Sequence, residues 1–287
     1  MAAVPPEPTT VESSPQTGQD AAQTPGPLTT FGQKVKENIK LAIRQYSVDK
    51  NRLLGYSAYI NGRPQHAAIY FLACLDKRPD DLKSHFYLGK VALDHYNDPV
   101  YARRHLEQAF AQESKRIRKI ENGRIIYKKF HETQVPWPGF DAIADALAES
   151  MQQSNDKAGL YQFLDHTIAK RGETADYIRK GRMLLKMNDV DNAQIAYRKA
   201  LQQADRKDPR PYLAMAKFYE SINHSEKELT FLRIVLYLDY DNKHVERRLK
   251  ALDIVKGRTL ALKPPPKPRK QRPGPKLPDI GGQELPG

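Results

Sequence analysis

The sequence predicts an all-α fold, a right-handed α-solenoid of stacked helical hairpins with disordered N- and C-terminal tails. Between residues 31 and 256, apolar residues recur at spacings of three and four, without the sustained alternation of a half-buried strand. A pattern of small, apolar and turn residues also returns every 34 or 35 residues. Fourteen of the 21 prolines lie in residues 1–30 and 257–287, which separates both ends from the middle.

The two ends differ in charge. Residues 1–30 contain three acids and neither Lys nor Arg, so we expect a disordered acidic tail there. Residues 257–287 hold seven basic and two acidic residues and are rich in proline, so we expect a basic disordered tail. Residues 264–268 match a Pro-x-x-Pro ligand pattern, and a plain basic linker is the alternative.

The 287 residues carry 47 Lys and Arg against 34 Asp and Glu, a formal net charge of +13. The amino terminus lacks a basic start and an apolar run, and no stretch approaches the ~20 apolar residues of a spanning helix. We therefore expect a cytoplasmic protein without membrane association. The single cysteine, Cys74, excludes an intramolecular disulfide.

Helical periodicity divides the ordered region into segments. An amphipathic helix at 31–47 would dock through Val35, Ile39, Ala42 and Tyr46. The remaining segments are two repeats at 48–115, a basic insertion at 116–139, a degenerate helical pair at 140–173, two further repeats at 174–242 and a capping helix at 243–256. Asp141 and Asn155 are the expected N-caps of the degenerate pair.

The repeats place a small residue, a turn, a second small residue and an aromatic or leucine in the same order, and the fourth copy has a glutamate at the second small position. The four copies place them at Gly55, Asn61-Gly62, Ala67 and Phe71; at Gly89, Asn97, Ala102 and Leu106; at Gly181, Asn188-Asp189, Ala193 and Tyr197; and at Ala216, Asn223, Glu228 and Leu232. Small residues allow two helices to approach closely, and the large residue fills the space between neighbouring pairs.

This pattern resembles that of the tetratricopeptide repeat family, over roughly residues 48–115 and 174–242. Asn51, His85, Tyr177 and Tyr212 stand where the family has its opening tryptophan. The resemblance implies stacked helical hairpins and a scaffold that binds other proteins without catalysis.

No catalytic or cofactor motif is present, so we expect neither an enzyme nor a bound cofactor or metal. Cys74 occupies a small-residue position of the repeat and is interpreted as a packed thiol. His85, His95 and His105 recur at spacings of ten, which does not form a one-turn metal-ligand pair.

The first helices of stacked pairs line the concave side of a solenoid. This predicts a basic, tyrosine-edged groove that binds an acidic or extended segment of a partner protein. Its residues are Arg52, Tyr56, Tyr59, Lys83, Tyr87, Lys90, Arg179, Arg182, Lys186, Arg210 and Lys217.

The alternative is association with nucleic acid or the ribosome, because phosphates require only positive charge and aromatic residues follow nearby for stacking. The residues of this second patch lie in the insertion: Arg116, Arg118, Lys119, Arg124, Lys128 and Lys129. The sequence alone does not identify the partner or the oligomeric state.

Overall fold

The computed structural model describes residues 33–121 and 135–266, and in these residues it contains twelve α-helices, one short 3-10 helix and no strand. The α-helices are α1 (Gln33–Gln45), α2 (Val48–Ile60), α3 (Pro64–Lys77), α4 (Leu82–Tyr96), α5 (Pro99–Glu121), α6 (Gly139–Gln153), α7 (Lys157–Lys170), α8 (Thr174–Lys186), α9 (Val190–Gln203), α10 (Arg210–Ser221), α11 (Ser225–Leu238) and α12 (Lys243–Ala251). The predicted all-α solenoid is confirmed. Both expected tails lie outside the described residues, apart from the first part of the C-terminal one.

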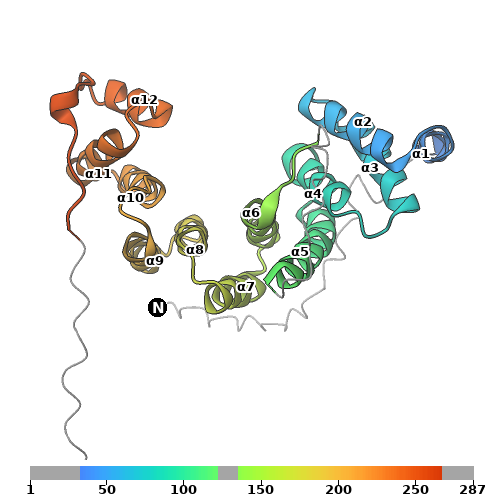
Figure 1. The fold of residues 1–287 in the computed structure, drawn as a ribbon, viewed down its shortest axis with the longest axis horizontal. Helices are drawn as coiled ribbons and strands as arrows, with labels where there is room; N and C mark the ends of the chain where they lie inside the picture. Colours follow the sequence, from blue (N-terminus) through green and yellow to red (C-terminus); the bar gives the residue numbers. More distant parts are fainter. Residues whose placement is uncertain (1–32, 122–134, 267–287) are drawn as a thin grey trace, which may run out of the picture.

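The helices form an open arc (Figure 1). Close hairpins join α2 to α3, α4 to α5, α8 to α9 and α10 to α11. Helices α4, α6, α8 and α10 lie on the inside of the arc, and α5, α7, α9 and α11 lie on the outside (Figure 1). Helix α6 packs chiefly against α5 rather than against α7, so the segment 140–173 is not a tight hairpin.

Asparagines set the turns inside the hairpins. Asn97, Asn155, Asn188 and Asn223 each follow the first helix of a pair and adopt a left-handed backbone with φ between 49° and 62°. Gly62 has the same role in the first hairpin, at φ 64°. Asparagine and glycine tolerate this conformation better than other residues, which explains their recurrence in the repeat pattern.

Several helices have a side-chain cap at their N-terminus. The carboxylates of Asp81, Asp156 and Asp189 accept hydrogen bonds from the backbone N–H three residues on, and satisfy a donor that the helix leaves unpaired. The expectation that Asn155 caps α7 is wrong, because Asp156 does so while Asn155 forms the turn. Asp141 is not a cap either: it lies in the first turn of α6, after Pro138 at the N-cap position.

Small residues bring the paired helices together as the repeat pattern requires. A Cβ added to Gly55 would lie 2.8 Å from the ring of Phe71, and one added to Gly181 would lie 2.7 Å from the ring of Tyr197. The side chain of Phe71 is fully buried, and Tyr197 is 4% exposed. The two glycines therefore leave the space that the aromatic rings of the second helices fill.

Both ends of the arc are covered. Helix α1 packs Val35 and Ala42 against Ile69 and Ala73 of α3. After α12, the chain returns along α11, where the backbone N–H of Leu262 donates to the carbonyl of Arg233 at 3.0 Å. Helix α12 ends at Ala251, before the expected end at 256, and α5 runs six residues past Lys115, into the segment expected to be an insertion.

Candidate functional site: the inner face of the arc

The inner face combines two regions of different chemistry. We call Tyr56, Tyr59 and Tyr87, on α2 and α4, the tyrosine wall. We call Asp145 and Glu149 of α6, together with Arg182 and Lys186 of α8, the ion-pair ladder. All seven residues belong to the first helices of the pairs, where the sequence predicted the concave surface.

Arg52 does not line an open groove, which corrects its assignment as a partner-binding residue. Its side chain is buried, with 6% of the residue exposed. The guanidinium donates to both carboxylate oxygens of Asp81, at 3.1 and 2.6 Å, and to Asp49 at 2.7 Å. Burial disfavours ionised Asp81, but the hydrogen bonds from Arg52 and Ser84 outweigh it and lower the pKa of Asp81.

Arg179 requires the same correction. It is 1% exposed and is surrounded by carboxylates of α6 and of its own helix, α8. Its guanidinium donates to Asp145 at 2.7 Å, to the fully buried Asp176 at 2.8 Å and to Asp141 at 3.2 Å. The predicted groove arginines at 52 and 179 therefore join elements of the fold, and each has its donors committed inside the chain.

The tyrosine wall is a packed aromatic cluster. The ring centroid of Tyr87 lies 5.1 Å from that of Tyr56, 5.7 Å from that of Tyr59 and 5.8 Å from that of Phe71. The Tyr59 hydroxyl donates to Asp94 at 2.8 Å. Burial raises the pKa of Tyr87 to about 12 and, together with the bond to Asp94, raises that of Tyr59. Both hydroxyls are therefore neutral hydrogen-bond donors at ordinary pH.

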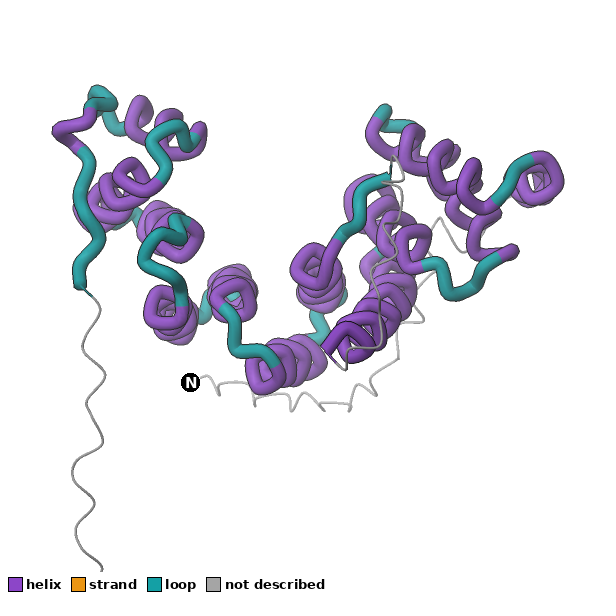
Figure 2. Tube along the Cα trace, viewed as in Figure 1, coloured by secondary structure: helices purple, strands orange, loops and turns teal. Residues whose placement is uncertain are grey.

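The lysines of α4 also have partners in the chain. Lys83 Nζ donates to the backbone carbonyl of Val135 at 2.5 Å, and Lys90 Nζ pairs with Asp94 at 2.8 Å. Burial and the nearby charge of Arg52 lower the pKa of Lys83. Residues 135–138 thus lie on the inner side of α4, as the teal segment before α6 shows in Figure 2.

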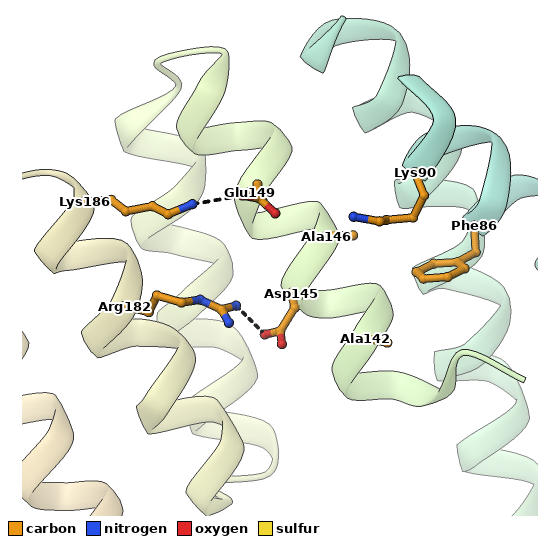
Figure 3. A pocket seen from close by; sticks show the side chains of 8 residues that line it. All are labelled: Phe86, Lys90, Ala142, Asp145, Ala146, Glu149, Arg182 and Lys186. Atoms are coloured by element: carbon orange, nitrogen blue, oxygen red, sulfur yellow. Dashed lines mark hydrogen bonds and ion pairs between the residues drawn. The ribbon is translucent and has the colours of Figure 1, made fainter. Parts of the chain in front are cut away.

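The ion-pair ladder connects α6 to the neighbouring inner helix α8. Arg182 pairs with Asp145 at 3.0 Å and Lys186 with Glu149 at 2.9 Å (Figure 3). These side chains are between 34% and 43% exposed, so solvent screens both pairs. Together with Lys90 and the apolar Phe86, Ala142 and Ala146, they line a pocket of about 300 Å³ between α4, α6 and α8.

The two remaining groove residues lie on α10. Arg210 is 65% exposed and pairs with Asp208 at 2.8 Å, and Lys217 is exposed. The basic groove is therefore not confirmed, because all the other predicted cations are paired with or donate to groups of the chain itself. From the sequence, Asp141 and Asp145 are expected to interrupt the cations of the inner wall, but Glu149 was not identified, although acids at 141, 145 and 149 share one face of α6.

The alternative nucleic-acid patch is only partly visible. Arg116 forms two hydrogen bonds with the buried carboxylate of Glu113, at 2.7 and 2.6 Å. Arg118 and Lys119 belong to α5, and their side chains are not described. Arg124, Lys128 and Lys129 lie outside the described residues. The patch therefore stays a prediction from the sequence.

The described residues contain no group of three His, Cys, Asp or Glu side chains placed to hold a metal ion. Burial raises the pKa of the Cys74 thiol to about 11. His85 and His105, at their spacing of twenty, lie side by side with their Nδ1 atoms 2.9 Å apart. Within the described ranges, no helix has the length and apolar character needed to cross a membrane.

By its fold, the chain is a tetratricopeptide-like helical repeat protein. The hairpins, the period and the contacts between glycines and aromatic rings carry this conclusion. No family model and no curated protein matches the sequence.

The chain aligns with several solved tetratricopeptide repeat structures. One from Parabacteroides merdae aligns over 76% of this chain and 77% of its own, at 9% identity and a TM-score of 0.49. A thermophilic repeat protein of Thermus thermophilus covers 71% of this chain and 98% of its own, at 14% identity and a TM-score of 0.42. The type IV pilus biogenesis factor PilW gives 76% and 100% coverage, 12% identity and a TM-score of 0.47. Similarity at this level gives no information about function.

Proposed function

We propose that this protein is a non-catalytic scaffold that binds an extended segment of a partner protein along the inner face of its arc. The observation that carries the proposal is the pocket between α4, α6 and α8. An apolar floor formed by Phe86, Ala142 and Ala146 is flanked by charged side chains of three helices. Such a site accommodates an apolar side chain of an extended peptide, while the rim fixes its backbone and charged groups.

A carboxylate of the partner segment can bind at the rim by replacing one of the chain's own acids. Lys90, Arg182 and Lys186 supply three cations around the pocket, and they pair with Asp94, Asp145 and Glu149 respectively. The carboxylate of a partner can exchange with Glu149 on Lys186, because a partly exposed pair of this kind contributes only about 0–1 kcal/mol. An acidic partner segment would thus compete with the chain's own acids for the cations of the pocket.

The test uses a library of random twelve-residue peptides selected on the full-length chain, followed by fluorescence anisotropy with the enriched peptides. We expect enriched peptides to contain an acid beside an apolar residue. The double change Arg182→Glu with Lys186→Glu should weaken their binding about tenfold or more, because both cations become repulsive. Glu149→Gln should strengthen it a few-fold, because it removes the competing carboxylate.

The matched control reverses two exposed cations of the outer helix α9, Arg198→Glu with Lys199→Glu, which changes the net charge equally. This control should leave the affinity unchanged. The proposal is wrong if no peptide is enriched, or if the inner and outer charge reversals weaken binding to the same extent.

A further inference from the structure

Residues Val135–Pro138 lie against α4 and belong to no helix. Val135 is 2% exposed, and its carbonyl accepts a hydrogen bond from Lys83 Nζ at 2.5 Å. The next carbonyl, that of Pro136, accepts from the Tyr87 hydroxyl at 3.1 Å. Two donors one helical turn apart on α4 therefore bind two consecutive backbone carbonyls, which is a contact with the main chain rather than with particular side chains.

Trp137 adds a specific contact to this arrangement. Its ring has Lys83 Nζ at 5.7 Å and the guanidinium carbon of Arg116 at 5.0 Å from its centroid. Arg116 is fixed in turn by two hydrogen bonds to Glu113, a carboxylate that is 1% exposed. The tryptophan therefore lies within reach of cations from α4 and α5, and cations within about 6 Å of an indole ring attract it.

The receptor side of this contact is rigid. Tyr56, Tyr59 and Phe71 pack around the Tyr87 ring and fix the direction of its hydroxyl. Pro136 and Pro138 fix their own φ and restrict the residues before them, Val135 and Trp137, so the segment loses little conformational entropy when it binds. A rigid aromatic surface that donates to the carbonyls of an extended proline-containing chain is a general mode of peptide recognition.

We propose that the tyrosine wall, with Lys83 and Arg116, is a second binding surface, selective for an extended segment of a partner protein with a tryptophan between two prolines, and that Val135–Pro138 is its resident occupant. The surface lies on α2, α4 and α5, so the proposal goes beyond the one made for the pocket between α4, α6 and α8. A partner segment takes over the contacts with Lys83, Tyr87 and Arg116 only after displacing the resident one.

This competition has a measurable size. A segment tethered to its own receptor acts at an effective concentration in the millimolar range. A peptide that binds the vacated surface with a Kd in the range of tens of micromolar therefore binds the intact chain at least about tenfold more weakly.

The first experiment vacates the surface in the full-length chain with V135G, P136S, W137G and P138S. The probe is a fluorescein-labelled peptide with the sequence of residues 133–141, followed by anisotropy. We expect binding to the vacated chain at least tenfold tighter than to the unchanged chain. The same peptide with alanine in place of tryptophan should bind at least tenfold more weakly. Absence of binding to the folded vacated chain, or equal binding to both chains, overturns the proposal.

A matched pair of variants in the vacated chain locates the binding. Lys83→Ala with Tyr87→Phe removes both hydrogen-bond donors and should weaken the binding of the peptide at least tenfold. Lys199→Ala with Tyr237→Phe changes the same residue types at exposed positions on α9 and α11 and should have no effect. Equal loss in both pairs would contradict the proposal.

A second measurement needs no vacated chain and applies if that variant does not fold. Trp137 is the only tryptophan of the protein, so its emission reports on this segment alone. The unchanged chain is titrated to several millimolar with an unlabelled peptide that contains 4-fluorotryptophan, which does not fluoresce. Displacement should shift the Trp137 emission to longer wavelength and increase its quenching by acrylamide. Unchanged emission and quenching at the end of the titration overturn the proposal.

Discussion

The tyrosine wall and the ion-pair ladder occupy corresponding places in the repeats but present different chemistry. The wall consists of neutral hydroxyls on packed rings, and a segment of the chain itself covers part of it. The ladder consists of partly exposed charges beside an open pocket. The glycine and aromatic positions that build the hairpins are similar in both halves, so hairpin packing does not dictate what the inner face presents. One solenoid can therefore present two chemically different surfaces on its inner face.

The largest effect on stability is expected at Arg179. Comparing it with Arg182 distinguishes a buried from an exposed charge in the region of the ion-pair ladder. Arg179→Leu removes the guanidinium that donates to the buried Asp176 at 2.8 Å and leaves only the more distant Arg171, at 3.7 Å, which should lower the free energy of unfolding by about 3–5 kcal/mol. Arg182→Leu removes a cation that pairs with Asp145, as Arg179 also does, but that is 43% exposed. This variant should change the free energy of unfolding by less than about 1 kcal/mol. Urea denaturation measures both. Similar values for the two variants would show that Arg179 is not a buried structural charge.

Acid should destabilise the half that contains the tyrosine wall, because the buried His85 and the partly buried His105 lie there. Burial lowers the pKa of His105 to about 4 and also lowers that of His85. The unfolded chain, with histidine pKa near 6.5, therefore binds more protons between about pH 6.5 and 4, and stability falls as the pH falls through this window. The loss should reach up to about 3 kcal/mol at pH 4.

Carboxylates titrate in the same window, so the comparison requires a variant. Thermal melts of the unchanged chain and of His105→Gln at pH 7 and pH 4.5 separate the two contributions. We expect the variant to lose less stability than the unchanged chain on acidification. Equal losses would mean that the histidine pair does not contribute.

Hairpin packing should respond alike in both halves. Gly55→Val and Gly181→Val each place a side chain against an aromatic ring, and each should lower the free energy of unfolding by about 1–3 kcal/mol. Ser57→Val, at an exposed position of α2, serves as the control and should cost only a few tenths of a kcal/mol. A large effect at only one of the two glycines would show that the halves are packed by different rules.

The smallest effect is expected for the exposed pair of Lys186 and Glu149. A double-mutant cycle with alanine at both positions should give a coupling of about 0.2–1 kcal/mol at low salt. The coupling should decrease at 1 M salt, where the Debye length is about 3 Å. A coupling that salt leaves unchanged would show that the pair is buried. A partner's carboxylate could then not replace Glu149 on Lys186.

Much of the fold could be predicted from the sequence because packing imposes a period on it. Gly55, Gly89 and Gly181 face large side chains of the second helices, and asparagines recur in the turns, so both leave a regular trace in the chain. The degenerate pair was harder to predict. In the sequence, Gly159 stands where a repeat unit would place a small residue, but a Cβ added there would meet the carboxylate of Asp156 rather than another helix.

The inner face could be predicted less well, because helical periodicity places a residue on a face without showing what lies opposite it. Arg52 and Arg179 were correctly placed on first helices, but Asp81 and Asp145, more than twenty residues away in the chain, cover them. Charge complementarity between α6 and α8 was visible in the spacing of their acids and bases. The contact of Val135 with Lys83 spans 52 residues and left no periodic signal.

The protein has one thiol, and its buried position makes its reactivity a probe of the opening of the first hairpin. Cys74 is fully buried, and its sulfur lies 3.2 Å from the carbonyl of Val48, at the start of the neighbouring helix. A reagent such as a disulfide dye reaches it only when α2 and α3 separate or the whole chain unfolds. The rate of dye release therefore rises with the population of the open states, and a single absorbance trace ranks how firmly a ligand or substitution closes this end of the arc.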